Sequence, residues 1–247
     1  IKSKKIETFE YWKFKKRKIY KNEIQDELQY LIKDSLRIRL RSDVKLGIYY
    51  SGGVDSSLLN SLHKFDYKFY FNDSKNYLDD FKKQIKKIVH HLDFPVGSLS
   101  SYPLWKLAEI ASKKVKVVIS GEGADEIFGG YVRYLPIARE WELRSSMPSY
   151  NYLFGKFYRP YLEGFSRITM RNQKYNYIKK IFEPYFNMFD DPINAMGFAD
   201  FKLVMPSLLQ MGDRMASAFG IENRCPFLDK SLIEFGFSLP PEYKIKG

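Results

Sequence analysis

The sequence predicts an α/β protein in which a parallel sheet is flanked by helices, with a helical C-terminal half. Apolar, β-prone runs end at Tyr50, Phe71 and Ile119, and segments of helical periodicity separate them. Strands that alternate with helices at this spacing are typical of βαβ units and a parallel sheet. The chain shows no comparable run after residue 131, which favours helices there.

The first segment supplies one strand and the helices around it. The N-terminal residues are basic and aromatic without a clear period, which favours an irregular lead-in. Apolar residues at helical spacing predict a helix at about 22–41, where Asn22 and Gln25 resemble a capping box. We expect a strand at Leu46 to Tyr50 and a second helix at about 55–64.

The next segment continues the alternation of strand and helix. A second strand is expected at Tyr67 to Phe71, followed by a helix over 78–92. Pro103 suits the first position of another helix, which would run to about Lys114. A third strand, Lys116 to Ile119, leads directly into an acidic segment that is bounded by glycines.

The rest of the chain is expected to be mostly helical. Pro206 opens a helix that Gly220 closes. A loop from Ile221 to Asp229 then leads to a short helix that ends at Pro240.

The composition fits a folded domain. With 45% hydrophobic and 28% charged residues, the chain can bury a full core. We expect one domain over 1–247, with an α/β core at about 22–135 and a helical part at about 136–247. A lone cysteine, Cys225, excludes a disulfide framework and a cysteine-rich metal site, and we expect it to be a small buried apolar residue.

The formal net charge of +12 allows two interpretations, a nucleic-acid surface or attraction of anionic nucleotides. The basic residues are spread along the chain and often alternate with apolar ones, as on solvated helix faces, so we do not expect a nucleic-acid partner. No apolar run approaches the roughly 20 residues that span a bilayer, and no signal peptide opens the chain. We therefore expect a cytoplasmic protein without a membrane segment.

A strand, a tight glycine turn and a helix start meet at S-G-G-V-D-S-S, residues 51–57. This arrangement directs backbone N–H groups and a helix dipole toward an anion, and the serine hydroxyls can add hydrogen bonds. Asp55 would repel an anion unless Mg²⁺ lay between them. The loop lacks the Gly-Lys-Ser/Thr of a Walker-type site, and the alternative is a turn that merely caps the helix.

The acidic segment after the third strand repeats this logic. It has the sequence S-G-E-G-A-D-E-I-F-G-G-Y over 120–131. Ligands of open α/β sheets bind at the carboxyl ends of the strands, which favours cation or substrate chemistry here. The alternative is a solvated acidic loop.

The motif of residues 51–57 resembles the pyrophosphate-binding loop of the N-type ATP pyrophosphatases, whose fold is adenine nucleotide alpha hydrolase-like. Three further blocks, G-E-G-A-D-E-I-F-G-G-Y, L-L-Q-M-G-D-R-M and I-E-N-R-C-P-F-L-D, are similar to the synthetase domain of the asparagine synthetase family and follow the family's order. The resemblance extends from about residue 8 to residue 247.

The resemblance implies an ATP-dependent carbon–nitrogen ligase. Members activate a carboxylate, the side chain of aspartate in asparagine synthetase, as an adenylate with release of pyrophosphate, and ammonia then forms the amide. Glu122 matches the residue that accepts a proton from ammonia, and Asp55 and Asp125 match the positions that hold Mg²⁺. The expected ATP-binding residues are Tyr50, Ser51, Gly52, Gly53, Val54, Asp55, Ser56, Ser57, Ser120 and Gly121.

Polar residues of the C-terminal half also match the family. They would shape the acceptor side of the site or form structural pairs. The residues are Asp213, Arg214, Glu222, Arg224 and Asp229.

The sequence departs from the family in three places. It lacks the glutaminase domain with its N-terminal cysteine, and it begins with Ile1, so we expect a piece of a longer protein that receives ammonia from outside this chain. The stretch between Phe71 and Tyr77 is short. The chain ends just before the family's catalytic lysine, and Lys244 and Lys246 precede that position.

Several alternatives stay open. The acceptor could be another carboxylate, such as a sugar or a precursor of a secondary metabolite, and the chain could bind nucleotide without turnover. A basic nucleic-acid-binding module is a weaker alternative, and a homodimer is compatible with the resemblance.

Overall fold

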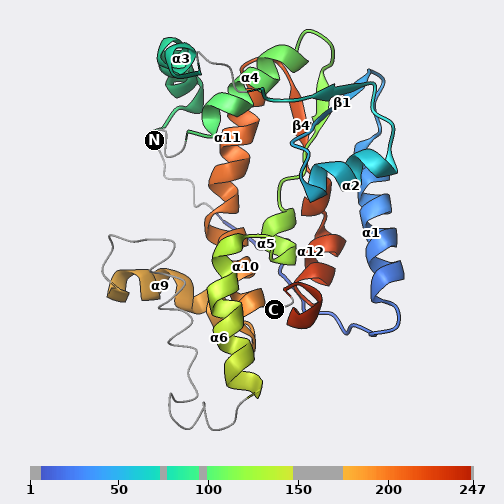
Figure 1. Cartoon of the computed structure of the whole chain (residues 1–247), viewed down its shortest axis with the longest axis vertical. Coiled ribbons are helices and arrows are strands. Elements are labelled where there is room, and N and C mark those ends of the chain that lie inside the picture. Colours follow the sequence, from blue (N-terminus) through green and yellow to red (C-terminus); the bar gives the residue numbers. More distant parts are fainter. Residues whose placement is uncertain (1–6, 73–76, 95–98, 147–174, 246–247) are drawn as a thin grey trace.

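Figure 1 shows the computed structural model, in which residues 7–72, 77–94, 99–146 and 175–245 are described. A four-stranded sheet with the order β2-β1-β3-β4 forms the upper part of the molecule in this view. Every strand pairs in parallel with its neighbour. The predicted parallel sheet flanked by helices is therefore confirmed.

The secondary structure consists of short strands and longer helices. The strands are β1 (Leu46–Tyr49), β2 (Tyr67–Phe69), β3 (Val117–Ile119) and β4 (Glu222–Arg224). The described helices of the first half are α1 (Ile24–Arg39), α2 (Val54–Leu62), α3 (Tyr77–Leu92), α4 (Ser101–Ala111), α5 (Ala124–Phe128), η1 (Val132–Tyr134) and α6 (Leu135–Ser146). Those of the second half are α9 (Tyr175–Phe186), α10 (Pro192–Leu203), α11 (Met205–Ser217), η2 (Pro226–Leu228), α12 (Lys230–Gly236) and η3 (Pro241–Tyr243).

The start of α1 corrects one local expectation. The residue at its N-cap is Glu23, and no side chain caps the helix there, so the predicted capping box of Asn22 and Gln25 is wrong. Asp26 and Glu27 lie in the first turn instead, where acidic side chains interact favourably with the helix dipole.

The segment expected as a loop from Ile221 to Asp229 corrects another. It contains the edge strand β4, whose residues pair with β3 from Val117↔Glu222 to Ile119↔Arg224. Its E-N-R sequence has no apolar run, and the strand forms because β3 offers a free edge to pair with. The C-terminal half is otherwise helical where it is described, as predicted.

The order of the strands reverses beside β1. The chain passes from β1 through α2 to β2 on one side, and then through α3 and α4 to β3 on the other side. The crevice outside the carboxyl ends of two such strands is where open α/β sheets bind ligands. Both predicted motifs begin there, at Ser51 after β1 and at Ser120 after β3.

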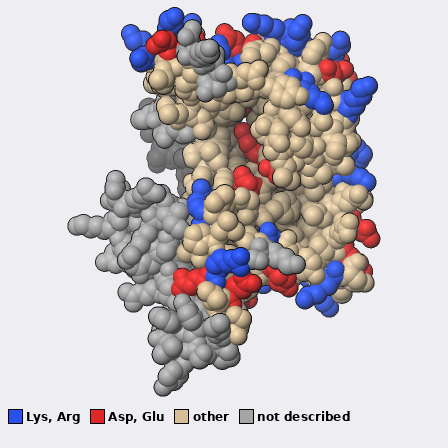
Figure 2. Space-filling model, viewed as in Figure 1, with Lys and Arg blue, Asp and Glu red and all other residues tan. Residues whose placement is uncertain are grey.

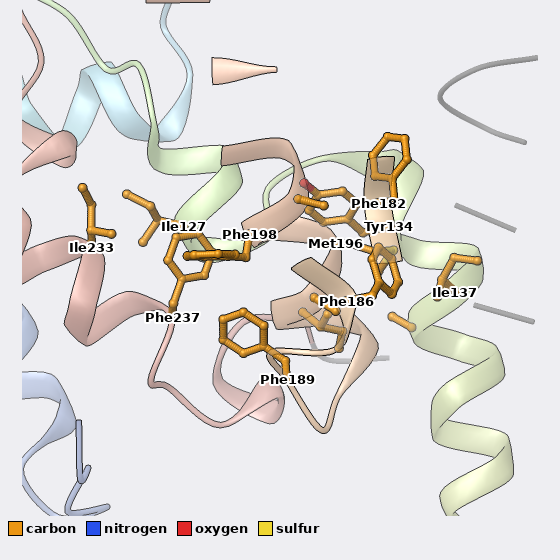
Figure 3. Packing of buried hydrophobic residues seen from close by; sticks show 14 residues of the cluster. Ile127, Tyr134, Ile137, Phe182, Phe186, Phe189, Met196, Phe198, Ile233 and Phe237 are labelled. Atoms are coloured by element: carbon orange, nitrogen blue, oxygen red, sulfur yellow. The ribbon is translucent and has the colours of Figure 1, made fainter. Parts of the chain in front are cut away.

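Two of the apolar clusters among the described residues bear on the site. The sheet cluster centres on Ile48, Leu59 and Ile119, each with no exposed surface, and the inner face of α1 covers it. The lower cluster joins α5, α6, α9, α10 and α12. Aromatic rings dominate it, as Figure 3 shows, and its labelled members are Ile127, Tyr134, Ile137, Phe182, Phe186, Phe189, Met196, Phe198, Ile233 and Phe237.

Helix α10 is the central element of the lower cluster. Its residues from Pro192 to Asp200 are all buried. A Cβ at Gly197 would lie 2.3 Å from the backbone oxygen of Glu126, so only glycine lets α10 approach α5 this closely. Gly236 likewise lets α12 approach α5 closely, because a Cβ at Gly236 would lie 2.1 Å from the side chain of Ile127. The short helix α5 is therefore held between two helices from the C-terminal half.

The described helices include none that combines the length and the apolar character required to cross a membrane.

Candidate functional site

The loop after β1 presents an exposed backbone at the start of α2. Gly52 adopts a positive φ of 79°, a conformation that disfavours residues with a Cβ. Gly53 is the N-cap of α2 and carries no side chain that could occupy the first helical amides. Because Ser51 to Val54 are exposed, the backbone at the start of α2 opens to solvent, and an anion can approach the N-terminus of the helix there.

Hydroxyl groups line the same loop and are fixed by one another. The Tyr50 hydroxyl lies 3.0 Å from Ser57 Oγ, and Ser51 Oγ lies 3.2 Å from Ser56 Oγ. The Gly53 amide donates to Ser51 Oγ at 3.2 Å. The predicted ATP-binding residues of this loop therefore form one connected cradle of donors.

The second motif begins beside this cradle. A Cβ at Gly121 would lie 3.0 Å from Asp55 Cβ, so the end of β3 and the first turn of α2 are in contact. The structure thus places Gly121 next to the first turn of α2, and Ser120 precedes it at the end of β3. Acidic side chains lie in a hollow at the centre of the face shown in Figure 2.

Asp55 and Asp125 form a pair of partly buried carboxylates across the crevice. Burial raises the pKa of Asp55, and the charge of Asp125 raises it further. Burial also raises the pKa of Asp125, which the Arg133 guanidinium partly offsets. The charge of Asp125 disfavours the ionisation of Asp55, and a cation between the two carboxylates would favour it.

The chemistry of this pair fits Mg²⁺. Hard carboxylate oxygens are ligands that Mg²⁺ prefers, and it usually takes only one or two of them together with substrate phosphates and water. Within the described residues, no group of three or more His, Cys, Asp or Glu side chains could hold a metal alone. A pair of aspartates beside a phosphate cradle is therefore suited to a metal that arrives with its nucleotide.

The backbone around Asp125 is tightly shaped. Gly123 and Gly129 flank α5 with positive φ angles of 97° and 76°. A Cβ at Gly130 would lie 2.0 Å from Asp125 Oδ1, which explains a glycine at that position. Glu126, the third acid of this segment, points into the core and accepts a hydrogen bond from the Tyr131 hydroxyl at 2.5 Å. Asp125 and Glu126 thus lie on different sides of α5, with Glu126 toward the core and Asp125 toward Asp55.

Glu122 lies between β3 and β4 and is hydrogen-bonded by three side chains. Ser120 Oγ, Asn223 Nδ2 and Cys225 Sγ each donate to Glu122 Oε2 at 3.2 Å. Burial raises the pKa of Glu122, while the bonds from Cys225, Ser120 and Asn223 oppose that rise. The environment therefore combines a desolvated carboxylate with donors that favour its ionised form.

The role of Cys225 corrects the expectation of a small apolar filler. Residue Cys225 is only partly buried, and its thiol donates a hydrogen bond to the Glu122 carboxylate. Asn223 was not among the predicted site residues. In an extended segment, residues i and i+2 share one face. The polar side chains of Asn223 and Cys225 have this spacing, which could have indicated that both face the site. The signal was lost because the segment was assigned to a loop.

Most of the polar residues that match the family in the C-terminal half form structural pairs. Arg224 contacts Glu222 at 2.7 Å and donates to the backbone oxygens of Arg39 and Arg41. Asp229 caps α12 through the Ser231 amide, and its other oxygen contacts Arg39 at 3.2 Å. The remaining two, Asp213 and Arg214, lie 3.9 Å apart on α11.

Lys244 packs beneath α5, away from the loop of residues 51–57. Its Nζ donates to the backbone oxygen of Ile127 at 2.7 Å and to Asn194 Oδ1 at 2.5 Å. Burial lowers the pKa of Lys244 to about 7. That Lys244 does not replace the family's lysine stays a prediction, and Lys246 and part of the short stretch after Phe71 lie outside the described residues.

Comparison with known proteins matches the family model described as asparagine synthase to residues 27–69 and 76–247. The asparagine synthetase 1 of Bacillus subtilis, named glutamine-hydrolyzing, is 26% identical over 95% of this chain and 46% of its own length. A Methanocaldococcus jannaschii protein that carries the name "Putative asparagine synthetase 2" is 34% identical over 53% of this chain and 32% of its own. A Sandersonia aurantiaca asparagine synthetase is 25% identical over 88% of this chain and 39% of its own.

The chain thus spans less than half the length of each of these relatives. The break in the family match falls at the shortened stretch before Tyr77. The match itself includes both motifs that meet at the crevice and the segment that carries Asn223 and Cys225. Because the family's pattern covers most of the sequence and every element of the site, the chain belongs to the asparagine synthase family.

Proposed function

We propose that this chain carries out ATP-dependent amide formation. A carboxylate, the side chain of aspartate in the simplest case, is adenylated with release of pyrophosphate, and ammonia then displaces AMP to give asparagine. The nitrogen comes as ammonia from a glutaminase domain outside this chain. The names of the relatives, which are glutamine-hydrolyzing asparagine synthetases, support this proposal.

The observation that carries the proposal is the meeting of three chemical functions at one switch point of the sheet. The exposed amides of α2 supply a phosphate site, the Asp55–Asp125 pair supplies a cation site, and Glu122 supplies a partly buried carboxylate. A phosphate site alone would support nucleotide binding. The Glu122 carboxylate, just after the neighbouring strand β3, adds the group that an amine nucleophile requires.

In the first step, the loop and its serines bind the phosphates that leave as pyrophosphate. Asp55 and Asp125 would hold the Mg²⁺, which when bound neutralises charge on the phosphate oxygens. The acceptor carboxylate attacks the α-phosphate and becomes an acyl adenylate. Ser120 and Gly121 follow β3 at the same crevice, where they would restrict the position of the nucleotide.

In the second step, ammonia attacks the acyl carbon and AMP departs. The nitrogen sheds a proton as the C–N bond forms, and Glu122 accepts it. Its burial raises the pKa toward the range in which a carboxylate can take up a proton from an amine. Glu122 would therefore act only after the adenylate has formed.

Glu122→Gln tests this order of events. With ammonium chloride and aspartate, we expect amide formation to fall about 10²–10⁴-fold, the usual contribution of a general base. Exchange of labelled pyrophosphate into ATP should persist, because the first step does not use Glu122. Glu109→Gln, which alters a carboxylate on α4 paired with Lys106, serves as the control and should leave both rates unchanged.

Other outcomes separate the alternatives. Loss of both reactions in Glu122→Gln would place Glu122 in the first step. Exchange that depends on a different carboxylate would change the acceptor and keep the mechanism. ATP binding without exchange for any carboxylate tested would leave a nucleotide-binding domain without turnover.

A further inference from the structure

The two carboxylate oxygens of Glu122 have different surroundings. Oε2 accepts all three hydrogen bonds, from Ser120 at the end of β3, Asn223 in β4 and Cys225 just after β4. Oε1 accepts none from the part of the chain that the structure describes. The carboxylate is therefore anchored at one oxygen and has lone pairs available at the other.

Helix α11 keeps the space beside Oε1 open. Gly212 faces the carboxylate, and a Cβ there would lie 3.1 Å from Oε1 and 3.6 Å from Oε2. Any larger residue at this position would press on the free oxygen. The contact between α11 and the sheet thus leaves Oε1 accessible while α11 still covers the site.

The two titratable groups on which the charge of Glu122 acts, Cys225 and Tyr49, have raised pKa values that keep them neutral. Burial raises the pKa of the Cys225 thiol, and the charge of Glu122 raises it further, which keeps the S–H in place as a donor. Burial and Glu122 likewise raise the pKa of Tyr49 on β1. Helix α11 contributes Gly212 beside the carboxylate, and this residue carries no charge. The charge of Arg39 lowers the pKa of Cys225 and so opposes part of the rise.

We propose that Asn223 and Cys225 are positioning residues that hold Glu122 by Oε2, so that Oε1 is the atom that accepts the proton from the nitrogen nucleophile. In this step the C–N bond forms, the bond from the acyl carbon to the phosphate oxygen breaks, and one proton passes from nitrogen to Oε1. The inference rests on the proposed function and assigns its proton acceptor to a single oxygen. It also assigns a role to the only cysteine of the chain.

Asn223 and Cys225 act together with Ser120 on the same oxygen of Glu122. Three donors on one oxygen prevent rotation of the carboxylate, which would otherwise exchange Oε1 and Oε2. They also favour the ionised form, which is the form able to accept a proton. Asn223 Oδ1 is buried without a hydrogen-bond partner, so the amide is held here for its N–H group at the cost of an unsatisfied oxygen.

Cys225→Ala and Asn223→Leu test the proposal through the pH profile of amide formation. Hydrogen bonds to a charged group contribute enough to shift its pKa by about one unit. We expect the rising limb of the rate profile to move about one pH unit upward in each variant, with about a tenfold lower rate on that limb. KM for ATP and pyrophosphate exchange should stay near the wild-type values, because the first step does not use Glu122.

Cys225→Ser is the matched control, because its hydroxyl restores a donor at the same position. A wild-type profile in this variant supports the proposal. A shift as large as that of Cys225→Ala would overturn it, because the effect would then come from altered packing. Should Cys225→Ala fail to fold, Asn223→Leu carries the test alone, since leucine removes a polar atom that is already unsatisfied.

The result for Glu122→Gln separates this inference from the proposed function. If that variant keeps full amide formation, the assignment of Glu122 as base fails. If it loses amide formation while the Cys225→Ala and Asn223→Leu profiles stay in place, Glu122 remains the base and the positioning role is overturned.

Discussion

The two motifs that meet at the crevice are built in opposite ways. The first loop, residues 51–57, is exposed over Ser51 to Val54, and its hydrogen bonds join residues no more than seven positions apart. The second motif, residues 120–131, lies between α10, α11 and α12, and its contacts come from residues up to more than one hundred positions away. The phosphate side of the site is thus local, whereas the side that carries Asp125 and Glu122 depends on distant packing.

This difference follows from the size of the elements. Helix α5 has five residues, too few to persist alone in water, so neighbouring helices must hold it in place. The close approaches at Gly197 and Gly236 and the hydrogen bond from Lys244 to Ile127 provide that support. Changes near the first loop should therefore mainly alter binding, and changes around the second motif should mainly alter stability.

The largest effect on stability is expected for Arg133→Met, which removes the charged partner of a fully buried acid and leaves it with the Tyr134 hydroxyl. Arg133 contacts Asp200 at 2.5 Å, and Asp200 has no exposed surface. Removing one partner of a buried pair typically costs about 3–5 kcal/mol of unfolding free energy. Denaturant unfolding at pH 7 measures the loss. Arg139→Met, which breaks an exposed pair with Glu142 on α6, is the control and should cost about 0.5 kcal/mol or less.

The same variant has a predicted pH dependence. Burial raises the pKa of Asp200 above its ordinary value, and Arg133 opposes that rise. Without Arg133 the folded state therefore holds a proton that the unfolded state has released, so stability falls as the pH rises above the ordinary aspartate range. The difference between wild type and Arg133→Met should be smaller at pH 5 than at pH 8. Equal losses in Arg133→Met and Arg139→Met would show that the second motif does not depend on this pair.

An intermediate effect is expected for Gly52→Ala in the first loop. The φ of 79° costs an alanine about 1–2 kcal/mol, although no atom except one of the Tyr50 ring lies within 4 Å of the new Cβ. Gly53→Ala is the control for backbone strain, because Gly53 has a φ of −71° that alanine adopts freely, and its Cβ would contact only the side chain of Ser51 at 3.3 Å. Denaturant unfolding should show the cost in Gly52→Ala, and calorimetry should show weaker ATP binding. Similar stability of the two variants would mean that the exposed loop relaxes without strain.

The contrast between the motifs also explains what the sequence could predict. The first loop and its strand were predictable, because a β-prone run, two glycines and a helical pattern follow one another within twelve residues. The second motif was predictable as an acidic segment, bounded by glycines, at the end of a strand. Its order of burial, with Glu126 inward and Asp125 toward Asp55, was not, because α10 decides it from a segment seventy residues away.

Strand β4 shows the same limit from the other side. Its residues carry no β signal of their own and pair with β3 because that edge is free. The donors Asn223 and Cys225 were consequently missed, although they lie on one face of an extended segment. The predicted capping box at Asn22 was wrong for a related reason. The sequence pattern suggests a cap, but the backbone path decides which residue is the N-cap, and here it is Glu23.

The smallest effect on stability is expected for Asp55→Asn, the variant that belongs to both motifs. Asp55 lies on the first loop, yet its pKa is raised by burial and by Asp125 of the second motif. A raised pKa in the folded state means that stability is lost as the pH rises through the range above the ordinary aspartate value. Replacing the charge with an amide should therefore leave the free protein equally stable or more stable by about 0.5 kcal/mol at pH 7.

Ligand binding should respond in the opposite direction. Because the Asp55–Asp125 pair supplies the charge that attracts Mg²⁺, Asp55→Asn should weaken ATP binding in the presence of Mg²⁺ and leave binding without Mg²⁺ nearly unchanged. Calorimetry with and without Mg²⁺ measures this difference, and thermal unfolding at pH 4 and pH 7 measures the stability. Asp43→Asn removes the same charge from an exposed position and is the control. A clear loss of stability in Asp55→Asn would make the aspartate a structural group of the first loop, and the two motifs would then share no cation.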